Sequence, residues 1–278
     1  MRVELLTFFL LAGLVQCRFN ANFYNYLVGK FGKAIADDLT RSDLGAKGSF
    51  GGGNPNASVL PVIVVHGLAG TAGLLRTRVY NKYLSYGQPR GTVFGTTYAN
   101  GDLMHSLAHG MQCDYVLKVR TLILAVHEYT KKKVNIIAFS MGSPISRKAI
   151  LGGRCVDTGT NLGAPISSFV HNFVSVAGAN NGAHFCTNSP FFHGICSPVN
   201  GLDCDSKFIK EINSDLHYEG KNVFSIYSTA DEVVGLMNNC HQRSSMIDGA
   251  VAIERDRLMH GAVIGQTTQE QWRALSAP

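Results

Sequence analysis

The chain lacks the clustered positive charge that nucleic-acid-binding proteins carry. Its 25 Lys and Arg residues against 19 Asp and Glu residues give a formal net charge of +6, spread in small groups. The one longer basic run is Lys131 to Lys133. Because nucleic acids are bound by basic stripes or patches, this distribution argues against a nucleic-acid partner and only slightly favours an anionic interface.

No apolar run reaches the roughly 20 residues that a membrane-spanning helix needs. The run from Leu5 to Val15 is shorter, follows a basic residue and ends beside Cys17, a pattern typical of a secretory signal peptide. We therefore expect residues 1–17 to be removed and residues 18–278 to be secreted and soluble, without a transmembrane segment. Residues 14–17 also resemble a bacterial lipoprotein signal, although the glutamine before the cysteine fits that pattern poorly.

Strong metal-binding spacings of His, Cys and Asp are also missing. His184 and His193 are the remaining zinc candidates, and no motif supports them. We therefore expect neither a metal nor another cofactor. Internal repeats and low-complexity linkers are absent as well, so residues 18–278 are interpreted as one domain. Two segments fall outside its regular pattern: residues 18–58 are expected to form an N-terminal cap segment, and residues 180–222 a cysteine-rich insertion that overhangs the active site.

Loss of the signal peptide leaves an even number of cysteines. In an oxidising compartment they predict up to three disulfides, but six cysteines allow 15 pairings and the sequence does not choose among them. Asn56 begins an Asn-Ala-Ser sequon and is a candidate glycosylation site. The six cysteines are Cys113, Cys155, Cys186, Cys196, Cys204 and Cys240.

Short β-branched runs alternate with helical patterns from residue 59 onward. This alternation predicts an α/β fold with a mostly parallel central sheet and helices on both faces. The expected strands are 60–66, 92–97, 134–139, 173–177, 222–227 and 250–253. The expected helices are 74–86, 114–129, a segment from about 144 to 151, and 269–275.

One strand-to-helix junction carries a candidate nucleophile. Ser140 follows an apolar strand and precedes a helix, with Ala138 and Gly142 as small residues two positions to either side. Such a turn exposes the serine hydroxyl, and it requires small flanking residues because the backbone passes close to itself. In this arrangement the oxyanion formed during acyl transfer is held by two backbone amides, which here would be those of Met141 and Leu68.

The remaining members of a catalytic triad are expected in the order acid, then histidine. Asp231 follows the strand 222–227, with Glu232 as its rival, and His260 follows the strand 250–253. Because parallel strands end at the same edge of a sheet, these side chains would meet Ser140. His241 lies too early for this role, and His66 is interpreted as a structural hydrogen-bonding residue.

Around these residues the sequence resembles the class 2 triacylglycerol lipase family, which includes small secreted bacterial lipases. The matching stretches are VVHGLAG (64–70), VNIIAFSMG (134–142), VSVAGAN (174–180), SIYSTAD (225–231) and LMHG (258–261). The resemblance implies an α/β-hydrolase that cleaves carboxylic esters, including acylglycerols, without a cofactor. It also implies Ser140, Asp231 and His260 as the triad, with the amides of Leu68 and Met141 as oxyanion donors.

Three functions compete on this sequence. The first is a secreted lipase acting on acylglycerols, with an ester or lipid substrate at a lipid–water interface. The second is a carboxylesterase of small soluble esters, because the same triad serves both. The third is a catalytically silent lipid-binding protein that keeps the scaffold. The oligomeric state, the acyl-chain preference and the presence of a lid are not encoded in any motif found here.

Overall fold

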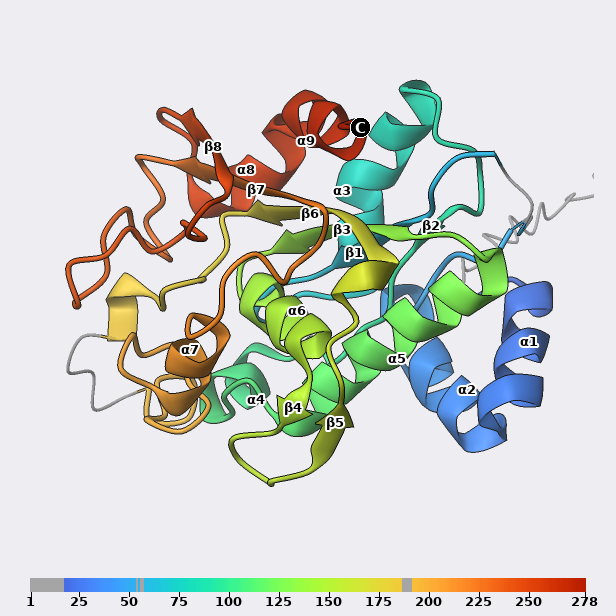
Figure 1. The fold of residues 1–278 in the computed structure, drawn as a ribbon, viewed down its shortest axis with the longest axis horizontal. Helices are drawn as coiled ribbons and strands as arrows, with labels where there is room; N and C mark the ends of the chain where they lie inside the picture. The colour runs from blue at the N-terminus through green and yellow to red at the C-terminus, as the bar shows by residue number, and fades with distance from the viewer. Residues whose placement is uncertain (1–17, 54, 56–57, 187–191) are drawn as a thin grey trace, which may run out of the picture.

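A computed structural model describes residues 18–53, 55, 58–186 and 192–278 (Figure 1). The predicted signal peptide 1–17 and the sequon residue Asn56 lie outside these residues. No helix in the described part of the chain is long and apolar enough to cross a membrane.

A six-stranded parallel sheet forms the centre of the molecule (Figure 1). Its strand order is β2-β1-β3-β6-β7-β8. All four residues of the β1 sequence VIVV are buried, as expected for a strand covered on both faces. The strands are β1 (Val62–Val65), β2 (Val93–Phe94), β3 (Val134–Phe139), β6 (Val170–Val176), β7 (Asn222–Ser228) and β8 (Val251–Arg255).

Helices cover both faces of this sheet, which confirms the predicted fold class. On one face α3 (Ala72–Ser85), α8 (His260–Gln266) and α9 (Thr268–Leu275) pack on a core that includes Val64 and Ile137. On the other face α5 (Cys113–Thr130) and α6 (Gly142–Leu151) pack on a core that includes Val65 and Ile136. Neighbouring residues of one strand enter different cores because successive side chains point to opposite faces.

The N-terminal segment extends the second of these layers. It contains α1 (Ala21–Phe31), α2 (Lys33–Thr40) and the 3₁₀-helix η1 (Ser42–Lys47), and α1 and α2 pack beside α5 (Figure 1). Phe50 exchanges two backbone hydrogen bonds with Gly95, of 2.9 and 3.0 Å. The strand β2 ends at Phe94, so the predicted strand 92–97 is too long, and Gly95 pairs with Phe50 as an isolated bridge.

The insertion 180–222 joins β6 to β7 and contains η3 (His184–Cys186) and α7 (Lys207–Ile212). Within the described residues it packs against α4 (Leu103–Ala108), since the amide of Ile195 donates to the carbonyl of Leu107 at 3.0 Å. The prediction of three disulfides is confirmed, with the pairs Cys113–Cys155, Cys186–Cys196 and Cys204–Cys240. The second pair lies within the insertion, and the third ties it to the connection between β7 and β8.

Several short elements were not foreseen, among them a hairpin, a 3₁₀-helix and helix α8. The hairpin β4 (Gly153–Arg154) and β5 (Asn161–Gly163) is polar and very short, so it has no alternating apolar pattern. The remaining 3₁₀-helix is η2 (Ser167–Phe169). Helix α8 begins at His260 without a side-chain cap from its N-cap residue Met259, so the sequence carries no local start signal for it.

Candidate active site

Ser140 lies on a strained turn between β3 and α6. Its φ of 55° is in the left-handed region, which a non-glycine residue rarely adopts. A Cβ atom at Gly142 would lie 2.3 Å from the carbonyl oxygen of His66, so only glycine fits there. Gly142 is thus the small residue that the turn was expected to need, because the chain just after β1 passes too close for a side chain.

The imidazole of His260 connects Ser140 to Asp231. Its Nε2 lies 2.9 Å from Ser140 Oγ, and its Nδ1 lies 2.8 Å from Asp231 Oδ2. All three side chains belong to residues that follow the carboxyl ends of strands β3, β7 and β8. The structure therefore brings together the three residues that the sequence singled out, across separations of 120 and 29 positions.

Asp231 is held by its backbone surroundings as well as by the histidine. Its Oδ1 accepts hydrogen bonds from the amides of Val233 and Val234, at 3.0 and 2.9 Å. Burial raises the pKa of this carboxyl, but the hydrogen bond and charge of His260 and the two amides together lower the pKa below its ordinary value of 3.8. Asp231 is therefore ionised at neutral pH, with one oxygen fixed and the other directed at the imidazole.

Glu232, the rival acid, has a different partner. Its Oε2 accepts a hydrogen bond of 2.8 Å from the backbone amide of His260, the first residue of α8. Glu232 thus supplies the capping hydrogen bond that the N-cap residue Met259 does not give. It contacts the backbone amide of His260 and not its imidazole. Sequence reasoning missed this contact because the two residues are 28 positions apart and belong to no capping motif.

The two candidate oxyanion amides belong to two chain segments that meet at Ser140. Met141 follows Ser140 directly, and Leu68 follows Gly67, where a Cβ atom would lie 3.2 Å from Ser140 Oγ. Within the described part of the chain, neither amide donates to a backbone or side-chain acceptor. Both N–H groups are therefore open donors near the serine hydroxyl.

His66 supports this loop as a buried neutral imidazole. Its Nδ1 lies 2.8 Å from the carbonyl of Gly67, its Nε2 accepts the amide of Tyr98 at 3.2 Å, and the two rings stack at 3.9 Å. Burial is the main reason why the pKa of His66 falls to about 4. One ring nitrogen donates and the other accepts, so the contacts fit a structural residue and leave no nitrogen for proton transfer.

Potential metal ligands do not gather around the predicted zinc candidates. Among the residues that the structure describes, groups of three ligand atoms within 4.8 Å consist of a disulfide pair with a neighbouring aspartate, and neither His184 nor His193 belongs to one.

The parallel sheet and the serine turn at its carboxyl edge define the protein as an α/β-hydrolase. The family model described as Lipase (class 2) matches residues 59–273. The chain belongs to the class 2 lipase family. No curated protein sequence matches it.

Solved structures with the same fold include two microbial lipases and an esterase. Lipase BlEst2 of Bacillus licheniformis, in mature form, is 13% identical with a TM-score of 0.57, and the match covers 81% of this chain and 96% of that one. Lipase B of Aspergillus fumigatus is 18% identical with a TM-score of 0.53, covering 73% and 46%. A truncated carbohydrate esterase from gut microbiota is 14% identical with a TM-score of 0.54, covering 81% and 88%. The chain thus spans less than half the length of the fungal protein.

Proposed function

We propose that the protein is a secreted lipase that hydrolyses carboxylic ester bonds of acylglycerols through an acyl-enzyme. The observation that carries the proposal is the continuous chain of contacts from Ser140 Oγ through the imidazole of His260 to Asp231. A serine hydroxyl becomes an effective nucleophile when a base within hydrogen-bond distance takes its proton, and a carboxylate behind the base fixes its tautomer.

Each step uses one of these groups. Ser140 Oγ bonds to the ester carbonyl carbon while its proton moves to His260 Nε2, and the ester C–O bond then breaks as the leaving alcohol takes that proton. Water attacks the acyl-enzyme with the same base and releases the acid. Asp231 stabilises the imidazolium formed in both halves, and the open amides of Leu68 and Met141 would hold the carbonyl oxygen as it becomes negative.

Exposed apolar side chains near the site favour acylglycerols over small soluble esters. Met259 precedes His260 and is 61% exposed, and Leu74 in the first turn of α3 is 51% exposed. Helix α4 adds Leu103 and Met104, and Gly101 just before it packs on Thr71 at the end of the Leu68 loop. Large apolar side chains exposed beside a reactive residue are the kind of surface that a lipid contacts.

Secretion is supported by the three disulfides, because such bonds persist mainly in oxidising compartments. Within the described residues they account for all six cysteines that remain after residue 17. Mass spectrometry of the N-terminus of protein released into the medium tests this part of the proposal, and retention of residues 1–17 would contradict it.

Replacing the nucleophile tests the reaction itself. Ser140→Ala should lower kcat on a long-chain acylglycerol emulsion by roughly 10⁴- to 10⁶-fold, because the nucleophile and its partners act as a unit. Ser146→Ala is the matched control, since Ser146 is a buried serine of α6 whose hydroxyl donates to the carbonyl of Gly142. Full activity of the Ser140 variant would overturn the mechanism.

Two further measurements separate the competing functions. A carboxylesterase of soluble esters would show no gain in activity when a short-chain ester passes its solubility limit, whereas the proposed lipase should show one. A silent lipid-binding protein would not react with an active-site phosphonate. Labelling followed by mass mapping should place the phosphonate on Ser140.

A further inference from the structure

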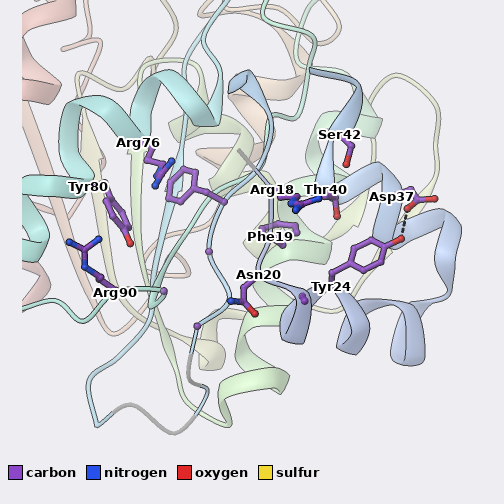
Figure 2. A pocket seen from close by; sticks show the side chains of 15 residues that line it. Arg18, Phe19, Asn20, Tyr24, Asp37, Thr40, Ser42, Arg76, Tyr80 and Arg90 are labelled. Atoms are coloured by element: carbon purple, nitrogen blue, oxygen red, sulfur yellow. Dashed lines mark hydrogen bonds between the residues drawn. The ribbon is translucent and has the colours of Figure 1, made fainter. Parts of the chain in front are cut away.

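Arg41 is a mostly buried arginine at the junction of α2 and η1. Its neighbours Thr40 and Ser42 line a pocket of about 790 Å³ (Figure 2). Arg41 is not one of the described residues that line this pocket. Its side chain is 12% exposed and lies at a second pocket together with Tyr98 and Ala99. The guanidinium is therefore directed from the N-terminal segment toward the chain that follows β2.

Each nitrogen of the Arg41 guanidinium donates a hydrogen bond. Nε and Nη2 donate to the two carboxylate oxygens of Asp43, at 3.0 and 2.9 Å. Nη1 donates to the carbonyl of Thr97 at 2.7 Å and also to the carbonyl of Ala99. A two-pronged contact with a carboxylate fixes the plane of a guanidinium. The third nitrogen is thereby held between two main-chain carbonyls of one short segment, residues 97–99.

Residues 97–99 in turn hold both ends of the loop that carries Leu68. At the start of this loop, the amide of Tyr98 donates to His66 Nε2 at 3.2 Å, and the two rings stack at 3.9 Å. At its end, Thr97 Oγ1 accepts a hydrogen bond of 2.8 Å from the amide of Ala72. The loop 67–71 is therefore fixed at both ends by the segment that Arg41 holds.

We propose that Arg41 is a positioning residue for the reaction, and that it fixes the loop 67–71 so that the Leu68 amide stays beside Ser140. This inference rests on the proposed function, because it gives that amide the oxyanion to hold. Such a donor has to be in place before the charge develops, and removing one typically costs about 100- to 1,000-fold in kcat. The match to the class 2 lipase family begins at residue 59, so this role belongs to a segment outside the match.

Arg41→Met tests the proposal, because it keeps an unbranched side chain and removes all its donors. The buried carbonyls of Thr97 and Ala99 then lose that donor, so the segment should move. On a soluble ester kcat should fall by about 10- to 100-fold, with KM within about twofold of wild type, as for a contact made in the transition state. A trifluoromethyl ketone adds to Ser140 Oγ and leaves a negative oxygen in the oxyanion site. Its affinity should fall by the same factor as kcat.

Arg120→Met is the matched control. Arg120 of α5 is also buried, and its guanidinium donates to the carbonyls of Ala149 and Ala164 at 2.6 Å each. Both variants should lose similar stability in urea, but only Arg41→Met should lose kcat and ketone affinity. Arg41→Lys should recover most of the lost kcat, because an ammonium group can donate to both carbonyls of the segment 97–99. Equal kcat for Arg41→Met and Arg120→Met would overturn the role of Arg41.

Hydrogen exchange followed by mass spectrometry reports on the loop without any reaction. The peptide covering residues 66–72 should exchange faster in Arg41→Met than in Arg120→Met, and equal exchange rates would also overturn the role. A wild-type protein that neither hydrolyses the ester nor binds the ketone would refute the proposed function, and this role with it. An active wild type with no difference between the two arginine variants would refute only the role of Arg41.

A milder variant keeps the test decisive if Arg41→Met does not fold. Asp43 is 61% exposed, so Asp43→Asn should fold, and it weakens the contact that fixes the guanidinium plane. Its kcat should fall by about two- to fivefold. Asp38→Asn is the control, because Asp38 is 55% exposed in the same segment and pairs with Lys118. Equal kcat for these two variants would overturn the role of Arg41.

Discussion

Two buried charge pairs in this molecule have different roles: one holds two parts of the fold together, and the other faces the candidate nucleophile. His260 and Asp231 have side-chain exposures of 10% and 2%, and Arg147 and Glu219 have 2% and 1%. In the Arg147 pair every guanidinium nitrogen already donates to Glu219, to Asn213 or to the carbonyl of Ile212. In the His260 pair one ring nitrogen faces a serine hydroxyl with open backbone amides beside it.

The difference shows that burial and pairing do not by themselves mark a reactive site. Arg147 joins helix α6 to the insertion, and each nitrogen of its guanidinium donates a hydrogen bond across that contact. His260 keeps capacity that a substrate can use. Buried and paired ionisable groups occur in both settings, so the role of a pair depends on what it faces, which for His260 is the hydroxyl of Ser140.

The largest effect is expected when the pair of His260 and Asp231 is disrupted by a substitution that keeps the shape of the acid. Asp231→Asn should lower kcat by about 10⁴-fold with little change in KM, because the amide holds the imidazole in the wrong tautomer and cannot stabilise its charge. Steady-state kinetics on a soluble ester measure this, with Glu232→Gln as the neighbouring control. If Asp231→Asn and Glu232→Gln lowered kcat equally, the two acids would not have the different roles given to them here.

Breaking the second pair should cost stability. Arg147→Met leaves Glu219 buried without its counter-charge and should lower the free energy of unfolding by about 3–5 kcal/mol. Urea denaturation measures this loss, and Arg147→Met/Glu219→Leu should recover most of it because no isolated charge remains. Lys210→Met, which breaks the exposed pair with Asp205, should change stability little. Equal effects of Arg147→Met and Lys210→Met would show that burial does not matter here.

His66 is a third kind of buried ionisable group, because it has no counter-charge and is held neutral by burial. Since its pKa is lowered to about 4 from 6.5, the neutral form stabilises the fold fully above pH 6.5, and this contribution is lost as the pH falls toward 4. The loss amounts to about 3 kcal/mol. Unfolding free energies measured from pH 7 to pH 4 should fall less steeply for His66→Gln, whose amide offers one donor and one acceptor without titrating. Identical pH slopes for both proteins would refute this role.

The smallest effect concerns the backbone of His260. Glu232→Ala should lower kcat/KM by about tenfold through a displaced imidazole, whereas Glu232→Gln should stay near wild type because its amide oxygen still accepts the N–H. Asp157→Ala is the matched control, since Asp157 Oδ2 accepts the amide of Cys113, the first residue of α5, at 3.0 Å. Both alanine variants should lose similar stability, and only the first should lose activity. Equal activity of the two alanine variants would assign Glu232 a purely structural role.

Much of the fold follows from local sequence signals. The apolar runs that became β1 and β3 are buried, and the glycine two residues after Ser140 is required by the close approach of the His66 carbonyl. The positions of Asp231 and His260 after β7 and β8 also follow, because parallel strands direct their ends to one edge. These features depend on short stretches of chain, which is why they could be predicted.

Features that depend on distant partners could not be predicted. The capping hydrogen bond at the start of α8 comes from Glu232, and Gly95 just after β2 pairs with the distant Phe50. The choice among 15 cysteine pairings requires the positions of loops that the sequence does not specify.

The Cys204–Cys240 bond closes a ring of covalent bonds that contains all of β7 together with Asp231. Residues 214–217 lie inside this ring and are exposed, so they offer a site for proteolytic cleavage. A chain cut there would remain one molecule until the bond is reduced, and its two fragments would still carry the serine and the aspartate on a common scaffold. Nicked protein in a protease-rich fluid should therefore keep its activity and separate into two bands only on a reducing gel.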